Sequence, residues 1–451
     1  MKITFNNLIK KSSILSLPGL ISIFISLSSI PVHLNLAGPE SYGNYIIFHF
    51  ILMLSVTLNL GIGKSTAISI NNFPKENKKI SFKAIKYSMN ISCLIFLTYC
   101  CLVLINFFII KNSNFYVYSF LLLIGSIITI FFISIEGILQ GNRKFEIVSV
   151  LNLFFFSLSF SVPSLLLLIN NNFSLVELIM FSILIKLTTV ILIFIIIYNK
   201  KYIKKSKSKI LFINLKRNSK WITLNGILTQ FYDLLDKYLI KYFLGPVALT
   251  IYTVPQQLTG KLSIFSKSFS AFLLPDLSKK KVDNVDFEYS LKIFTCILPL
   301  TIFILFPFYE IILKFWLTKS FNKEILDLTK IFSLSVIFSC ISHILVTKFE
   351  ATKKLDKNLK IELLLLPIFL VSLVILVVQK NSLLSISILI LIKEFILCIL
   401  RLNFLKKEVR YFYDYCLITV VLIIILFLSF FNQILFYASL IILFLIIFKK
   451  N

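Results

Sequence analysis

Ionisable side chains stand inside two apolar segments that a Leu-Gly-Pro turn joins at residues 244–246. Asp233 and Asp236 lie in the first segment, and Lys261 and Lys267 lie in the second. A charged side chain inside a membrane span is costly, so such residues usually face a partner or a water-filled cavity. This stretch therefore predicts the lining of a transport path.

Lysines within apolar segments are the candidates for contact with an anionic substrate. Lys186 and Lys261 lie nearest the centres of their segments, whereas Lys64 and Lys267 lie close enough to an end to snorkel towards the headgroups. A protonated lysine in a water-filled cavity attracts an anion such as a diphosphate as a point charge with three donors. The predicted substrate contacts are Lys64, Lys186, Lys261 and Lys267.

The two aspartates have two interpretations. Asp233 and Asp236 form structural ion pairs with Lys237 and Lys241, or they titrate and couple transport to an ion or a proton. We keep both as candidates for ion coupling.

Polar side chains recur on one face of the first apolar segment, where Ser22, Ser26, Ser29 and His33 are spaced three or four residues apart. Such stripes line a cavity or hold neighbouring helices together by hydrogen bonds. Similar stripes occur before and after the Leu-Gly-Pro turn. The predicted cavity-lining residues are Ser22, Ser26, Ser29, Thr229 and Gln257.

The composition places these residues in a polytopic all-α membrane protein, because 58% of the 451 residues are hydrophobic. A span needs about 20 mostly apolar residues. The sequence predicts about 14 transmembrane helices, or 12 if the last two form a re-entrant segment. They cover 13–34, 44–70, 84–110, 115–138, 146–169, 174–198, 221–243, 248–274, 291–317, 326–348, 361–379, 383–404, 413–431 and 433–448.

The distribution of lysine and arginine predicts the orientation. With the N-terminus inside, the outer loops hold only Lys111, Lys319, Lys323 and Lys380, and the cytoplasmic segments hold most of the others. Both termini are therefore predicted to be cytoplasmic. The net charge of +27 follows from this asymmetry and does not imply a nucleic-acid partner.

A repeat at an offset of 207 residues predicts two parallel six-helix lobes. Gly38 and Pro39 recur as Gly245 and Pro246, and Tyr45 recurs as Tyr252. Transporters with such repeats bind their substrate between the repeats and rock one against the other. The predicted parts are an N-terminal lobe (1–199), a basic cytoplasmic linker (200–220), a C-terminal lobe (221–405) and two extra helices (406–451).

The sequence shows no sign of an enzyme. It has no P-loop, GxSxG or HExxH motif, and its seven cysteines and three histidines form no metal-binding pattern. We therefore expect neither a catalytic site nor a cofactor nor a bound metal.

Several runs resemble the polysaccharide-export flippases (Wzx-like) of the multidrug/oligosaccharidyl-lipid/polysaccharide exporter (MOP) superfamily. They are the run LIKYFLGPVALTIYTVPQQL after Asp236, Pro275 beyond it, the run AGPESYGNYIIF with the following LNLGIGKSTA, and LQGNRKFEIVSVLN. The resemblance covers most of residues 10–400. It implies a flippase in a bacterial plasma (inner) membrane that moves an undecaprenyl-diphosphate-linked oligosaccharide to the outer leaflet for O-antigen, lipopolysaccharide or capsule synthesis.

The resemblance also implies a cationic cavity, and Lys64 and Lys261 lie on the expected helices. Partners would be the lipid-linked oligosaccharide, membrane lipids, a polysaccharide polymerase and a chain-length regulator. Two alternatives remain. A cation or drug antiporter of the same superfamily would need carboxylates at the centre of its cavity, and a membrane polysaccharide polymerase would need a large hydrophilic loop.

Overall fold

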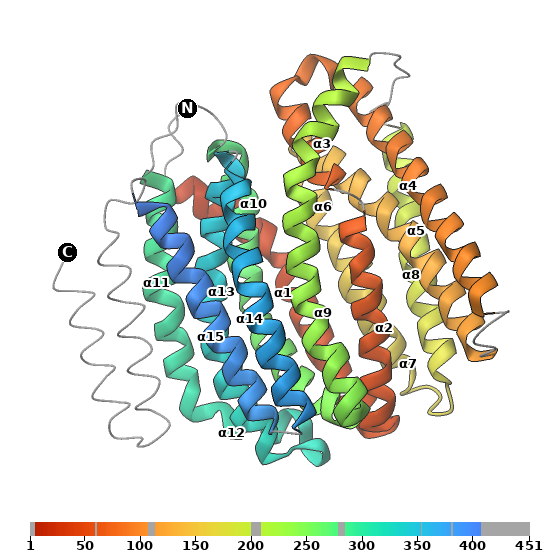
Figure 1. Cartoon of the computed structure of the whole chain (residues 1–451), viewed down its shortest axis with the longest axis vertical. Helices are drawn as coiled ribbons and strands as arrows, with labels where there is room; N and C mark the ends of the chain where they lie inside the picture. The colour runs from red at the N-terminus through yellow and green to blue at the C-terminus, as the bar shows by residue number, and fades with distance from the viewer. Residues whose placement is uncertain are drawn as a thin grey trace. The chain divides into compact units, whose positions relative to one another are not determined.

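A computed structural model of the protein describes residues 5–58, 61–106, 113–199, 209–277, 285–352, 354–379 and 382–406 (Figure 1). Every regular element in these ranges is a helix, as the sequence predicts. In chain order the elements are α1 (Phe5–Leu36), α2 (Gly38–Leu58), α3 (Ile62–Asn72), η1 (Pro74–Glu76), α4 (Asn77–Ile105), α5 (Ser113–Gly141), α6 (Phe145–Asn152), η3 (Leu153–Leu158), α7 (Ser159–Leu166), α8 (Leu175–Asn199), α9 (Lys209–Gly260), α10 (Ser263–Leu277), α11 (Val285–Leu305), η4 (Phe306–Phe308), α12 (Tyr309–Leu317), η5 (Thr318–Ser320), α13 (Lys323–Ala351), α14 (Leu355–Val378) and α15 (Leu383–Phe404).

The described helices make the protein a multi-pass membrane protein. Within the described ranges, seven helices are long and apolar enough to cross a bilayer, or eight if α2 and α3 together form one bent span. Helices lie on each of the first twelve predicted segments. The predicted spans 413–431 and 433–448 lie outside the described residues, so the total of about 14 stays a prediction.

Several predicted spans are broken rather than straight. The segment 44–70 bends by 41° between α2 and α3, next to Gly61, whose φ is 64°. The segment 248–274 is interrupted between α9 and α10, and 146–169 contains the π-helical η3. The segment 291–317 passes through the 3₁₀ turn η4, where Pro307 lacks the amide hydrogen that a continuous helix needs.

The predicted Leu-Gly-Pro turn at residues 244–246 is present. The backbone of α9 breaks at Gly245, which has φ 90° and ψ 173°. Gly38 precedes α2 with φ 83°. Glycine has no Cβ and adopts a positive φ at little cost, so both positions favour this residue. The two glycines that are 207 residues apart in the sequence thus share an unusual backbone conformation.

The same two turns contact each other. The Thr250 hydroxyl donates a hydrogen bond to the Pro39 carbonyl oxygen at 2.6 Å. Gly43 approaches the Pro246 carbonyl so closely that an added Cβ would collide with its oxygen. At the offset of 207, Pro39 corresponds to Pro246 and Gly43 to Thr250. The carbonyl of each proline therefore contacts the residue that lies four positions after the other proline.

Contacts between residues divide the chain into two compact units, unit 1 (Met1–Thr250) and unit 2 (Ile251–Asn451). In unit 1, α5 packs against α2, α3, α4 and α8, and α1 packs against α7 and η3. The rings of Phe132 and Phe155 stack at its centre, 3.8 Å apart. The predicted linker 200–220 is partly helical, because α9 begins at Lys209, and the predicted lobe boundaries stay predictions.

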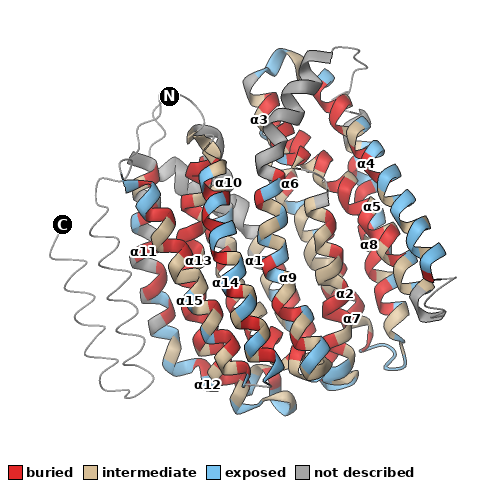
Figure 2. Cartoon of the chain, in the orientation of Figure 1, coloured by how far each residue is buried: buried red, intermediate tan, exposed pale blue. Residues whose placement is uncertain are grey.

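In unit 2, α13 is the central helix and packs against α10, α11, α14 and α15. In the most apolar stretch of α13, 78% is buried. In the most apolar stretch of the span that contains α4 in unit 1, only 17% is buried. Figure 2 shows exposed residues along α4. The exposed residues of this helix include Leu94, Phe96 and Leu97. An apolar helix face of this kind suits contact with lipid.

Candidate functional site

The interior of unit 1 contains a basic cluster, which we define as His33, His49 and Lys186. His33 is fully buried near the end of α1. Its Nδ1 lies 2.9 Å from the Ser164 hydroxyl of α7, and its Nε2 lies 3.3 Å from the Ser41 hydroxyl of α2. A neutral imidazole donates from one nitrogen and accepts at the other, and a hydroxyl satisfies either role. Both ring nitrogens of His33 are thus held.

His49 is the second member of the basic cluster. Its ring packs edge-on against the rings of Tyr45 and Phe160, with centroids 4.5 and 5.1 Å away. The Tyr45 hydroxyl in turn donates to the Phe160 carbonyl oxygen at 2.8 Å. His49 Nε2 is buried and has no hydrogen-bond partner among the described residues. It is therefore a buried polar atom whose hydrogen-bonding capacity is unused among the described residues.

Lys186 is the third member and comes from α8, with only 3% of the residue exposed. Its ammonium nitrogen lies 5.4 Å from the centroid of the Phe155 ring, a cation–π distance. Charges on Lys186 and on His33 both act on His49. Within the described part of the chain, Lys186 forms no ion pair with a carboxylate. Among the described residues, none of these three basic side chains forms an ion pair with a carboxylate.

The serine stripe of α1 lies on the same side of the helix. Ser22, Ser26 and Ser29 are all buried. Ser26 and Ser29 donate to carbonyl oxygens of the preceding turns, and Ser157 of η3 donates to the Ser22 oxygen at 2.6 Å. The Ser157–Ser22 bond holds α1 against η3, as the packing interpretation expects. The predicted role in lining a cavity stays a prediction.

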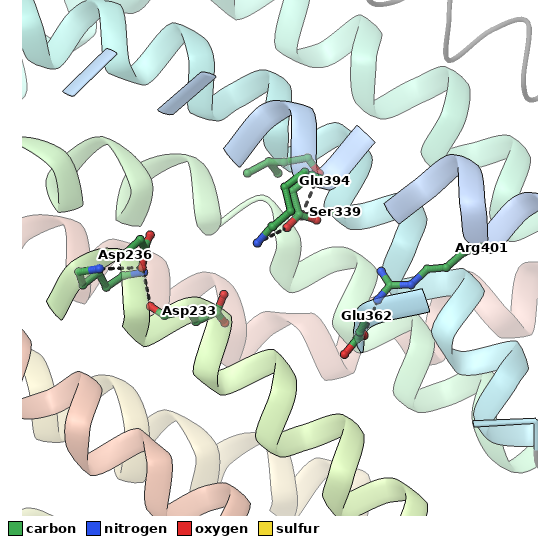
Figure 3. A network of polar contacts seen from close by, with 9 residues as sticks. Asp233, Asp236, Ser339, Glu362, Glu394 and Arg401 are labelled. Carbon is green, nitrogen blue, oxygen red and sulfur yellow. Dashed lines mark hydrogen bonds and ion pairs between the residues drawn. The ribbon is translucent and has the colours of Figure 1, made fainter. Parts of the chain in front are cut away.

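The two aspartates of α9 differ in their surroundings. Asp236 and Lys237 are each 2% exposed, and the Lys237 ammonium lies 3.2 Å from Asp236 Oδ1 (Figure 3). The same ammonium donates to the Asp233 backbone oxygen at 2.6 Å and lies 4.6 Å from the Phe50 ring centroid. The Asp233 side chain is exposed. The ion pair predicted for Asp236 is thus present, and a coupling role is untested.

The remaining predicted site residues have accessible side chains. Lys64 on α3 and Thr229 on α9 are exposed in unit 1. In unit 2, Lys267 on α10 is exposed, and Gln257 and Lys261 are half-buried beside the break between α9 and α10. Of the four predicted lysines, Lys186 is the one that is buried, and its described contact is with the Phe155 ring. Lys261 and Lys267 belong to unit 2.

Unit 2 contains an ionic cluster, which we define as Asn358, Glu362 and Arg401. The Arg401 guanidinium donates to Glu362 Oε1 at 2.6 Å and to Asn358 Oδ1 at 2.8 Å (Figure 3). Asn358 also donates to Glu362 Oε1 at 3.0 Å. All three residues are buried. The buried charge of Arg401 therefore has both an opposite charge and hydrogen bonds.

Sequence reasoning missed part of both clusters. It identified His33 and Lys186 but not His49 or the hydroxyls around them, and it assigned no role to Glu362. The available signal was spacing on one helix: Tyr45 and His49 are four residues apart, as are Asn358 and Glu362. In the ranges described above, no group of histidine, cysteine and acidic residues has the geometry of a metal site.

Comparisons with known proteins agree with this architecture. Residues 8–281 match the family described as polysaccharide biosynthesis protein. A comparison with curated protein sequences gives no match.

Solved structures of transporters are similar in fold. A MATE protein in the bent conformation is 15% identical with a TM-score of 0.64, covering 92% of this chain and 97% of its own. The inward-facing multidrug resistance MATE family transporter of the MOP superfamily gives 15% identity and a TM-score of 0.63, with coverage of 89% and 99%. A MOP superfamily transporter from Pyrococcus furiosus, described as having a binding pocket of reverse polarity, gives 14% and 0.60, with coverage of 89% and 98%.

These findings confirm the resemblance noted in the sequence and the expectation that the protein is not an enzyme. The solved structures show that the chain has a MATE-like helical fold. The chain belongs to the family described as polysaccharide biosynthesis protein.

Proposed function

We propose that the protein is a flippase for an undecaprenyl-diphosphate-linked oligosaccharide in a bacterial plasma membrane. It takes the lipid-linked repeat unit from the inner leaflet to the outer leaflet by alternating access between two lobes, with both termini in the cytoplasm. The product then feeds O-antigen or capsule-type polysaccharide synthesis, where a polymerase and a chain-length regulator act next.

The observation that carries this proposal is the family match over residues 8–281. Proteins that build surface polysaccharide handle glycans, and a membrane transporter among them needs a glycan that is already attached to a lipid. The electrostatics of the described residues support an anionic cargo, because lysines in the apolar segments have accessible side chains. A diphosphate group would contact Lys64, Lys261 and Lys267 as point charges.

The antiporter alternative receives less support from the described residues. A site for organic cations needs a free carboxylate at its centre. The two buried carboxylates in ion pairs, Asp236 and Glu362, are each occupied by a cation of the protein itself. The exposed Asp233 remains the one aspartate of α9 whose side chain is accessible for coupling.

The test is deletion of the gene in the parent strain, scored for surface polysaccharide and for the leaflet that holds the lipid-linked repeat unit. We expect loss of the polymer, with the intermediate retained on the cytoplasmic leaflet. Normal polysaccharide together with altered resistance to cationic compounds would reject the flippase and favour the antiporter.

Point variants then test the diphosphate contacts. Lys261→Ala and Lys64→Ala should abolish export while the protein is inserted normally, because each removes a charge from the path. Lys314→Ala is the matched control, because this lysine is exposed and forms an ion pair with Glu310, one helical turn earlier. If both test variants export as well as the control, neither lysine contacts the diphosphate.

A further inference from the structure

We propose that α12 is an interfacial helix of unit 2, which lies at the surface of the bilayer and binds anionic phospholipid. Its contact is a stripe of exposed apolar side chains on α12 and the turn before it. We call this stripe the lipid face and define it as Phe308, Ile311, Ile312 and Phe315. The inference concerns unit 2 alone and does not depend on the proposed function.

One face of α12 attaches the helix to unit 2. Tyr309, Leu313 and Leu317 recur every four residues and are all buried. The helix packs against α13, the central helix of the unit. Anchoring of α12 in lipid would therefore fix the depth of α13 in the membrane.

The lipid face is a second face of the same helix. Its members have the spacing i, i+3, i+4 and i+7, which places them on one side of a helix. Phe315 is 87% exposed and Ile311 is 66% exposed. A contiguous exposed patch of large apolar side chains indicates contact with a membrane or with another protein. In a multi-pass membrane protein the bilayer is the partner at hand.

The third face of α12 is charged. The Lys314 ammonium lies 2.7 Å from Glu310 Oε1, and both side chains are more than half exposed. Charged side chains exposed to the hydrocarbon are costly, so this pair belongs at the level of water and headgroups. A helix with charged side chains on one face and phenylalanine and isoleucine on another lies in the plane of the interface, with its apolar face at the boundary of headgroups and acyl chains.

The length of the preceding span agrees with this position. Residues 293–309, between Lys292 and Glu310, contain no aspartate, glutamate, lysine or arginine. About 17 residues is the shortest length that crosses the hydrocarbon, and this stretch has that length. The span therefore ends where α12 begins, after the 3₁₀ turn η4 with Pro307. Figure 1 shows α12 beyond the end of α11.

Two cations beside α12 favour an anionic headgroup. Lys319 in η5 and Lys323 at the start of α13 are exposed. The nearby acidic residues of α13, Glu324 and Asp327, are only half-buried to the same solvent and are thus less accessible than the lysines. Lysines at headgroup level attract anionic lipids. The lipid face and these lysines would thus hold the chains and the phosphate of the same lipids.

Tryptophan fluorescence measures the depth of the lipid face, because the chain has two tryptophans, Trp221 and Trp316. The full-length variant Trp221→Phe/Trp316→Phe/Phe315→Trp carries one indole, at the 87% exposed position. It would be reconstituted in bilayers of phospholipid brominated either near the glycerol or near the chain end. We expect the larger loss of fluorescence with bromine near the glycerol. If this variant does not insert, Trp221→Phe alone leaves Trp316 on α12 as the probe.

The matched control is Phe96→Trp in the background without the two native tryptophans. Phe96 is exposed on α4, near the middle of the uncharged stretch between Lys86 and Lys111, so bromine near the chain end should quench it more. The same deep pattern at position 315 would overturn the proposal, because α12 would then continue the span. Loss of fluorescence with neither lipid would overturn it as well, since water, another part of the protein or a second copy would then cover the lipid face.

The headgroup is tested with brominated phosphatidylglycerol and brominated phosphatidylcholine at equal mole fractions. The probe at position 315 should lose more fluorescence with the glycerol lipid, and Lys319→Gln/Lys323→Gln should reduce that difference. Lys78→Gln/Lys79→Gln removes the same charge from exposed positions on α4 and should leave it unchanged. Equal quenching by the two lipids would overturn the assignment of an anionic lipid. These measurements need no substrate, so they are decided separately from the flippase.

Discussion

Buried charges are treated differently in the two units. In unit 2, the Arg401 guanidinium is held by Glu362 and Asn358 at 2.6 and 2.8 Å. In unit 1, Lys186 is equally buried, but its ammonium lies over the Phe155 ring and forms no ion pair with a described carboxylate. Both positions lie in helices that are apolar enough to span a membrane. Arg401 thus has an opposite charge beside it, whereas the described contact of Lys186 is with an aromatic ring.

The difference indicates different roles. A buried charge with an opposite charge and hydrogen bonds maintains a fixed arrangement of helices, here α14 and α15. An uncompensated base is costly to keep charged, and such groups cluster at functional sites. The ionic cluster should therefore govern stability, and the basic cluster should govern activity.

The largest effect on stability is expected from breaking the ion pair of unit 2. Glu362→Leu leaves Arg401 buried without its counter-charge and should cost about 3–5 kcal/mol. The loss should appear as a large drop in the unfolding midpoint of the purified protein.

The double variant Glu362→Leu/Arg401→Met is the control for this prediction. It removes both charges and should recover most of the lost stability, because an apolar pair often replaces a buried ion pair without penalty. Equal stability of the single variant and the parent protein would mean that the ion pair does not hold α14 to α15.

A smaller loss is expected in unit 1 from Tyr45→Phe. The substitution removes the hydroxyl that donates to the Phe160 carbonyl and keeps the ring contacts with His33 and His49. The cost should be about 1 kcal/mol, the usual net value of one hydrogen bond. Thermal unfolding measures it. A loss as large as that of Glu362→Leu would show that hydrogen bonds stabilise unit 1 as strongly as ions stabilise unit 2.

The smallest effect on stability is expected from Lys186→Met. The methionine retains an unbranched apolar chain against Phe155, and no described carboxylate loses its partner. The unfolding midpoint should stay the same or rise, while export of surface polysaccharide is lost. A marked loss of stability would make Lys186 a structural residue like Arg401 and would remove the contrast between the units.

The fold was largely predictable from the sequence, and the clusters were not. A transmembrane helix needs about 20 mostly apolar residues, so apolar runs of this length indicate the helices. The breaks at Gly61 and between α9 and α10 escaped this rule, because hydropathy alone does not show where a backbone bends. The residues that complete each cluster are far apart in the chain: His33 meets Ser164, and Arg401 meets Glu362. A single sequence contains no signal for such pairs.

The contact between the turns at Pro39 and Pro246 has the form of an isologous interface, in which the same patch occurs on both sides of a two-fold axis. Two copies of one ancestral protomer would meet in this way in a homodimer. In this chain the symmetry is broken at one position, where Gly43 stands opposite Thr250. Gly43 makes only a backbone contact with the Pro246 carbonyl, whereas Thr250 donates a hydrogen bond to the Pro39 carbonyl. Covalent fusion of the two copies frees each half to change alone, so that one patch can loosen while its counterpart stays bonded.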